Sequence, residues 1–169
     1  PEKPAPVFIP IGTKDNVGMA GNVSDNLKSL LVEHDVMPNE NYTTITKTRY
    51  IDERTNTMFL RVDENDDKVS RCNVSKIRYD LYDAIIIADY CKGFLLEEDI
   101  TFVTKNHDRV FLDTKKILSD WCKDSFIIKI NNDEFLKTQH TLSETIKEKL
   151  ICKKETSSSL YKGNMYTDQ

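Results

Sequence analysis

Lysines stand beside carboxylates at several places in the second half of the sequence. Each of these places follows a short apolar run, and the segments are Asp89-Tyr90-Cys91-Lys92-Gly93, Asp113-Thr114-Lys115-Lys116, Asn131-Asn132-Asp133-Glu134 and Lys153-Lys154-Glu155. A lysine ammonium supplies charge to phosphate oxygens, and an aspartate or glutamate holds Mg²⁺ directly or through water. These residue types therefore suit an anionic, metal-bound ligand such as a nucleotide phosphate.

The same polar segments have a simpler explanation. Loops between strands and helices are polar in any case, and an aspartate or asparagine there often caps the helix that follows. For one loop, neither explanation is favoured over the other. Several such loops on one rim favour a binding function.

A second candidate is the stretch VGMAGNVSDNL over residues 17–27. Gly18 and Gly21 precede Asn22 and the start of a helical pattern, in a chain that has only 5 glycines. Two glycines so close together suggest a backbone that approaches a neighbour closely. Taken alone, the stretch could hold a phosphate at a helix N-terminus.

Other catalytic patterns are missing or weak. The sequence contains no GxxxxGK[ST] and no GxGxxG after a strand, which excludes a P-loop and a dinucleotide fingerprint. The histidines have no paired ligand spacing, and a catalytic thiol at Cys91 is disfavoured because no histidine is near it in sequence. The 4 cysteines form no CxxC, which fits a reduced cytosolic setting better than a disulfide framework or a zinc site.

Strands and helices alternate in the second half of the chain. Apolar runs predict strands over 82–90, 109–115, 126–132 and 150–154, and amphipathic patterns predict helices over 95–106, 115–123, 133–140 and 142–149. The continuous apolar run over 82–90 is typical of a strand buried on both faces. The alternation predicts a doubly wound α/β sheet with right-handed crossovers, whose strand ends share one edge.

The rest of the chain supplies smaller elements. We expect a short edge strand over residues 6–11, a helix from Ala20 onward and a β hairpin made of residues 42–51 and 57–62. Residues 74–82 suggest a short helix. Residues 159–166 suggest a closing hairpin around Lys162-Gly163.

Composition bounds the class of protein. The 169 residues are about one domain, with a net charge of -4 and a sequence pI of about 5.4. This balance argues against a nucleic-acid partner, because phosphate backbones require a basic surplus. No apolar run reaches the roughly 20 residues of a membrane helix, and no leader with a charged start opens the chain, so we expect a cytoplasmic protein.

Six segments bear a family resemblance. The segments GMAGNVSDNL, TKTRYID, LRVDEND, IADYCKG, VFLDTKK and INNDEF occur in the order of the ribokinase/PfkB family of carbohydrate kinases, and the match runs from about Pro4 to Tyr161. The chain resembles most of all the heptose kinase branch, the kinase domain of ADP-heptose synthase. The resemblance implies a single, partial ribokinase-like domain over residues 1–169. It would be a doubly wound, mainly parallel sheet with a small β lid at about residues 5–12 and 42–63.

The resemblance also implies an activity. The family transfers the γ-phosphoryl group of ATP, with Mg²⁺, to a sugar hydroxyl, so catalysis is mostly positioning and charge stabilisation. The resemblance implies contacts with the sugar or sugar phosphate at Gly18, Gly21 and Asn22 and at the lid residues Lys47 and Arg49. It implies a phosphoryl-transfer region at Asp89 and Lys92 and nucleotide contacts at Asp113 and Lys115. Asn131 and Glu134 would form the N-x-x-E motif, with Glu134 as the metal ligand.

The departures from the family pattern are also informative. Such kinases carry a Gly-Ala-Gly-Asp segment whose aspartate is the catalytic base, and no G-x-G-D occurs in this sequence, so we expect the base beyond Gln169. The family's opening strand, with a sugar-binding aspartate, is also not found. The chain therefore looks like the first half of a kinase fold or a shortened gene product, with little or no turnover.

Two other functions stay open. The chain could be a non-catalytic module that binds a nucleotide or a sugar, or an α/β interaction domain whose polar rim only caps helices. In each case an unpaired strand edge or the lid hairpin would favour a homodimer or a higher oligomer.

Overall fold

A computed structural model describes residues 7–153, 158–161 and 164–167 of the chain. The chain divides into two compact units, Pro1–Val36 and Met37–Gln169, and each is described by itself. Within the described residues, no helix combines the length and the apolar character that crossing a membrane requires.

The first unit contains one helix, α1 (Gly18–Ser29). It begins two residues before the predicted start at Ala20, and the cap residue Leu30 closes it by donating its backbone N–H to the carbonyls of Asn26 and Leu27. The expected lid strand at residues 5–12 is not formed in its described part, residues 7–12, which are neither helix nor strand. Pro10 has no N–H to donate to a ladder, which disfavours a strand there.

The hairpin of the second unit forms as predicted. Strands β1 (Thr46–Ile51) and β2 (Met58–Glu64) pair antiparallel, with Thr46 opposite Glu64 and Tyr50 opposite Leu60. The turn between them is held by Asp52, whose carboxylate accepts a hydrogen bond from the Thr55 hydroxyl at 2.7 Å. Both strands are largely exposed along their length.

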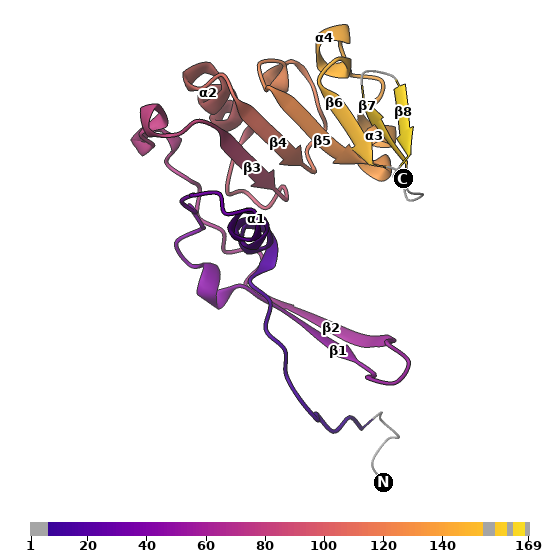
Figure 1. The fold of residues 1–169 in the computed structure, drawn as a ribbon. Helices are drawn as coiled ribbons and strands as arrows, with labels where there is room; N and C mark the ends of the chain where they lie inside the picture. The colour runs from indigo at the N-terminus through magenta and orange to yellow at the C-terminus, as the bar shows by residue number, and fades with distance from the viewer. Residues whose placement is uncertain (1–6, 154–157, 162–163, 168–169) are drawn as a thin grey trace. The chain divides into compact units, whose positions relative to one another are not determined.

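The main sheet has six strands in sequence order (Figure 1). The first four are parallel: β3 (Ile85–Asp89), β4 (Val110–Thr114), β5 (Ile127–Asn131) and β6 (Leu150–Lys153). β7 (Ser158–Tyr161) and β8 (Asn164–Thr167) extend the sheet antiparallel and form the predicted closing hairpin. Its Lys162-Gly163 turn lies outside the described residues. The chain is thus an α/β protein with a four-stranded parallel sheet.

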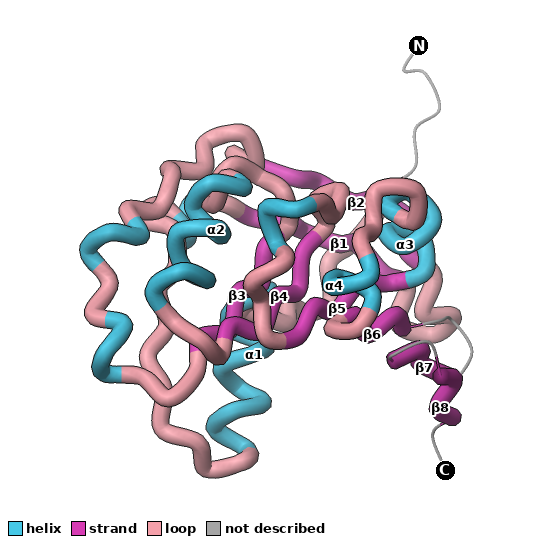
Figure 2. Tube along the Cα trace, turned by 90° about the horizontal axis from the view of Figure 1, so that it is seen from above, coloured by secondary structure: helices cyan, strands magenta, loops and turns pink. Residues whose placement is uncertain are grey.

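Helices α2 (Glu97–Asn106), α3 (Asn132–Thr138) and α4 (Glu144–Lys147) lie between the parallel strands in sequence. Since the strand order does not reverse, right-handed crossovers put these connections on one face of the sheet (Figure 2). This arrangement is compatible with a Rossmann-like fold. A doubly wound sheet requires a reversal of strand order, which the four parallel strands do not contain.

The core lies on the helix-covered face of the sheet. Alternate strand residues are buried there, among them Val110, Leu112, Ile128 and Ile130. The residues between them point to the opposite face and are half-buried or exposed, as Ile86 is at 46%. The expectation that the strand around Ile86 is buried on both faces is therefore wrong for one face.

Two of the predicted helices are replaced by shorter turns. Residues 74–82 form the 3₁₀ turns Val74–Lys76 and Tyr79–Leu81, and residues 115–123 form only the turn Asp120–Cys122. In the second case the Thr138 hydroxyl of α3 accepts the Leu118 N–H at 2.6 Å and bonds the Leu118 carbonyl at 3.1 Å. These tertiary hydrogen bonds use the backbone groups that a helix would need.

Candidate functional site

A buried carboxylate lies at the carboxyl ends of β3 and β4. The Asp89 side chain is 2% exposed, and its Oδ2 accepts hydrogen bonds from Thr114 Oγ1 at 2.8 Å and from Lys116 Nζ at 3.0 Å. Its Oδ1 accepts the Cys91 backbone N–H at 3.2 Å. Asp89 and Thr114 are register partners in the parallel ladder, which explains why they meet. The carboxylate is thus fully compensated by the protein itself.

The loop after β3 has an unusual backbone. Cys91 has φ 57° and Gly93 has φ 90°, so both residues that flank Lys92 are in the left-handed region. For cysteine this conformation is uncommon and strained, and such strain gathers at functional sites. The loop projects Lys92, whose side chain is 50% exposed.

A second lysine lies beside this loop. The Lys115 ammonium is 4.3 Å from the centroid of the Tyr90 ring, and the Lys115 backbone N–H donates to the Asp89 carbonyl at 3.2 Å. A cation over an aromatic face is attracted by the ring, which holds the Lys115 side chain beside this loop. We call Asp89, Lys92, Thr114, Lys115 and Lys116 the strand-end site.

The hairpin contributes a fourth lysine to the same region. Lys47 Nζ on β1 donates to Asp66 Oδ1 at 2.7 Å, and Lys92 Nζ lies 2.6 Å from Asp66 Oδ2. These two lysines hold the pKa of Asp66 below its usual range, Lys47 having the larger effect. The Asp66 hydrogen bond in turn raises the pKa of Lys92. The structure therefore brings together two residues to which the resemblance gave different roles, Lys47 in contact with the sugar and Lys92 in the phosphoryl-transfer region.

Arg49 lies on the same face of the hairpin as Lys47. Its register partner is Arg61, which forms a two-point ion pair with Asp63 at 2.7 and 2.8 Å. Two like charges directly opposite each other on a hairpin disfavour pairing unless an anion lies near them. Arg49 is exposed.

Asp113 does not join the strand-end site. Strand residues alternate between faces, so Thr114 points toward Asp89 and Asp113 points away from it. The Asp113 carboxylate accepts a hydrogen bond from Lys129 Nζ on β5 at 2.7 Å. Asp113 is therefore part of an ion pair on the sheet surface.

Asn131 and Glu134 form the cap of α3. The Asn131 side-chain oxygen accepts the Glu134 N–H at 2.8 Å, and Glu134 Oε2 accepts the Asn131 N–H at 2.7 Å. This reciprocal pair is a capping box. Within the part of the chain that the structure describes, no group of three or more His, Cys, Asp or Glu could hold a metal ion. The residues expected for Mg²⁺ therefore do not form a metal site of their own.

Gly18, Gly21 and Asn22 belong to the first unit. A Cβ at Gly21 would lie 2.5 Å from Cβ and Cγ2 of Val17, so this glycine is required by its own helix start. Gly18 has φ 71° and its N–H donates to Asn16 Oδ1 at 2.8 Å. Asn22 is exposed on α1. The close approach that the sequence suggested is thus explained locally for Gly21.

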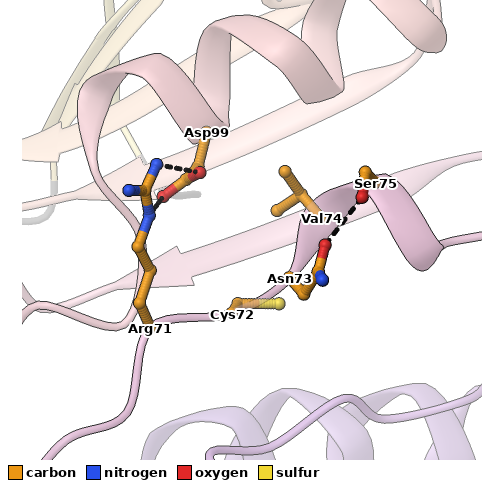
Figure 3. A pocket seen from close by; sticks show the side chains of 6 residues that line it. All are labelled: Arg71, Cys72, Asn73, Val74, Ser75 and Asp99. Carbon is orange, nitrogen blue, oxygen red and sulfur yellow. Dashed lines mark hydrogen bonds and ion pairs between the residues drawn. The ribbon is translucent and has the colours of Figure 1, made fainter.

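A surface cavity of about 380 Å³ lies elsewhere in the second unit (Figure 3). It is lined by Arg71, Cys72, Asn73, Val74, Ser75 and Asp99. Arg71 donates to both carboxylate oxygens of Asp99, at 2.9 and 2.8 Å, and also to Glu98. Burial alone would raise the pKa of Asp99, but Arg71 and the Leu96 N–H lower it below its usual value. Because Arg71 and Asp99 are already paired with each other, these charged groups of the cavity are poorly placed to bind a ligand.

Sequence reasoning missed two members of the strand-end site, Thr114 and Lys116, and also Asp66, which contacts Lys92. Thr114 and Lys116 lie in one of the polar segments at the strand ends, but the resemblance implied roles for Asp113 and Lys115 instead. The motif alone does not tell which of these side chains lie on the face of β4 that meets Asp89. Asp66 is the last residue of the segment LRVDEND, which carries part of the resemblance, but no role was implied for it. The alternation of buried residues along β4 could have identified Thr114, whereas nothing in LRVDEND distinguishes Asp66 from the other acidic residues of that segment.

Comparison with known proteins gives no assignment: no family model, no curated protein and no solved structure matches this chain.

The strand-end site and the residues around it carry more positive than negative charge. Asp89 is neutralised from within by Lys116, so it does not cancel the charge of the lysines around it. Lys115 is stacked on Tyr90, and Lys92 shares Asp66 with Lys47. In a chain of net charge -4, this region holds a local cationic surplus. Such a site suits an anionic group and has no evident general base.

Proposed function

We propose that this chain is the ligand-binding part of a carbohydrate kinase-like protein. It would hold a sugar or a sugar phosphate together with the phosphates of ATP at the carboxyl ends of β3 and β4. The observation that carries the proposal is the buried Asp89–Thr114–Lys116 network, which joins the D-Y-x-K-G and D-x-K segments and leaves Lys92 and Lys115 at the rim. A ribokinase-like fold belongs to this proposal.

In such a reaction these residues would act by position and charge. Lys92 and Lys115 would face phosphate oxygens, while Asp89 would fix the two loops that carry them. No residue of this chain is assigned as the base that takes the proton of the sugar hydroxyl, since the sequence contains no G-x-G-D segment. We therefore expect binding without turnover.

Calorimetric titration of the 169-residue chain tests the proposal. The ligands are ADP with Mg²⁺, a hexose phosphate and the neutral hexose, each at low and high salt. Lys115→Met should weaken binding of a phosphorylated ligand about tenfold, the loss of one charged contact. Lys105→Met, an exposed lysine at the end of α2, should leave the affinity unchanged. Equal affinities for both variants, or no binding by the unaltered chain, would refute the proposal.

A non-catalytic nucleotide- or sugar-binding module is the second candidate. It is favoured by Asp113 and Glu134, whose carboxylates already serve an ion pair and a helix cap. Binding of ADP with Mg²⁺ in the absence of any sugar or sugar-phosphate binding would support this candidate over the first.

A further inference from the structure

Asp66 links the hairpin to the loop that carries Lys92. It lies just after β2, in a turn where Asn65 has φ 56° and its side chain donates to the Thr44 carbonyl at 2.8 Å. Lys68 closes this turn by donating its N–H to the Asn65 carbonyl at 3.0 Å. The turn is therefore held in place by hydrogen bonds other than those of Asp66.

Each oxygen of the Asp66 carboxylate serves a different lysine. Oδ1 accepts from Lys47 at 2.7 Å and Oδ2 lies 2.6 Å from Lys92 Nζ, and the Asp66 side chain is 21% exposed. Two ammonium groups on one carboxylate, from segments far apart in sequence, make the same contacts that a phosphate or carboxylate group of a ligand would make.

Asp63, the other carboxylate near Lys47 on the hairpin, is a poor substitute for Asp66. Lys47 reaches Asp63 only at 3.5 Å, and Asp63 is held at shorter range by Arg61. Without Asp66, Lys47 and Lys92 would face each other as like charges beside Arg61. The pair thus forms an anion site whose occupant is a group of the chain itself.

We infer that the Asp66 carboxylate is an internal occupant of the Lys47–Lys92 anion site, and that an anionic ligand group entering this site displaces it and takes over its contacts with both lysines. The ligand part of this inference rests on the proposed function. Anion binding and the ion pairs of Asp66 are then linked negatively, and the linkage is reciprocal: removal of the Asp66 carboxylate strengthens anion binding, and a bound anion weakens the Asp66 ion pairs.

Two substitutions of equal charge test the inference. Asp66→Asn removes the internal anion, whereas Asp67→Asn removes the same charge from an exposed neighbour. Hydrogen exchange of the unliganded chain should show faster exchange at Lys47 and at residues 92–93 in Asp66→Asn than in Asp67→Asn. Unchanged protection in Asp66→Asn would overturn the attachment, and this readout needs no ligand.

The second readout is affinity for inorganic phosphate and for a hexose phosphate. Asp66→Asn should bind either probe about tenfold more tightly than Asp67→Asn, because the ligand no longer competes with two ion pairs. Weaker or equal binding by Asp66→Asn would overturn the competition. If no variant binds any phosphorylated probe, the proposed function and the competition both fail, while the exchange result decides the attachment separately.

Discussion

At the scale of single residues, the strand-end site depends on one compensated charge. Asp89 is buried with the ammonium of Lys116, itself only 9% exposed, and the hydroxyl of Thr114 completes the set. A buried pair of this kind adds little net stability, but removal of one partner leaves the other charge uncompensated. Asp89 therefore fixes the geometry of the site more than it stabilises the fold.

Asp89→Asn should lower the free energy of unfolding by about 3 kcal/mol, because Lys116 then remains buried without a counter-ion. Urea denaturation followed by circular dichroism measures this change. The matched control is Asp80→Asn, which breaks an exposed pair with Arg78 at 2.8 Å and should leave the free energy of unfolding nearly unchanged. Similar losses in both variants would contradict the role given to Asp89.

At the scale of elements, the N-x-x-E segment fits two explanations, a cap of helix α3 and a motif that binds a nucleotide and its metal ion. Asn131 ends β5 and caps α3, and Glu134 returns a hydrogen bond to the Asn131 N–H. Both residues are therefore explained by helix formation alone.

Replacing the cap separates these explanations. Asn131→Ala should destabilise the chain by about 1 kcal/mol, while Asn131→Ser should keep most of the stability because serine is also a good cap. The midpoint of thermal unfolding reports the difference. If Asn131→Ser instead abolishes nucleotide binding while the midpoint is kept, the residue has a binding role beyond the cap.

The attachment of the hairpin should depend on pH in a defined direction. Lys47 and Lys92 lower the pKa of Asp66 below 3.8, so the stabilisation is fully present above about pH 4 and is lost as the pH falls through the lowered value. The amide NMR shifts of Lys47 and Lys92 should hold steady from neutral pH to about pH 4 and change together below it. In Asp66→Asn this joint transition should be absent. A transition near neutral pH would indicate another group.

At the scale of the whole molecule, the sequence predicted more of the sheet than of the site. The β1–β2 hairpin, the four parallel strands, the closing hairpin and helices α1 to α3 follow from periodicity and turn residues. The helix predicted at residues 115–123 is replaced by the short turn Asp120–Cys122, because hydrogen bonds from Thr138 on a distant element override the local preference for a helix. Asp66 was missed for a similar reason, since its lysine partners come from separate segments.

The expected homodimer stays a prediction with a direct test. The face of the hairpin that carries Tyr50, Leu60 and Val62 is apolar and exposed, and a two-stranded hairpin is marginal without a covered face. A second copy of the chain would cover it. Sedimentation velocity at micromolar concentrations should show a dimer that Leu60→Lys converts to a monomer. A monomer at every concentration would count against this oligomer.

The central claim is that phosphorylated ligands bind at the carboxyl ends of β3 and β4. Amide NMR spectra of the full chain, titrated with ADP and Mg²⁺ and then with a hexose phosphate, locate the contact residue by residue. The account predicts the largest shift changes at residues 90–93 and 114–116, with smaller ones at Lys47. Changes centred on the cavity at Arg71 and Asp99, or none at any ligand concentration, would contradict it.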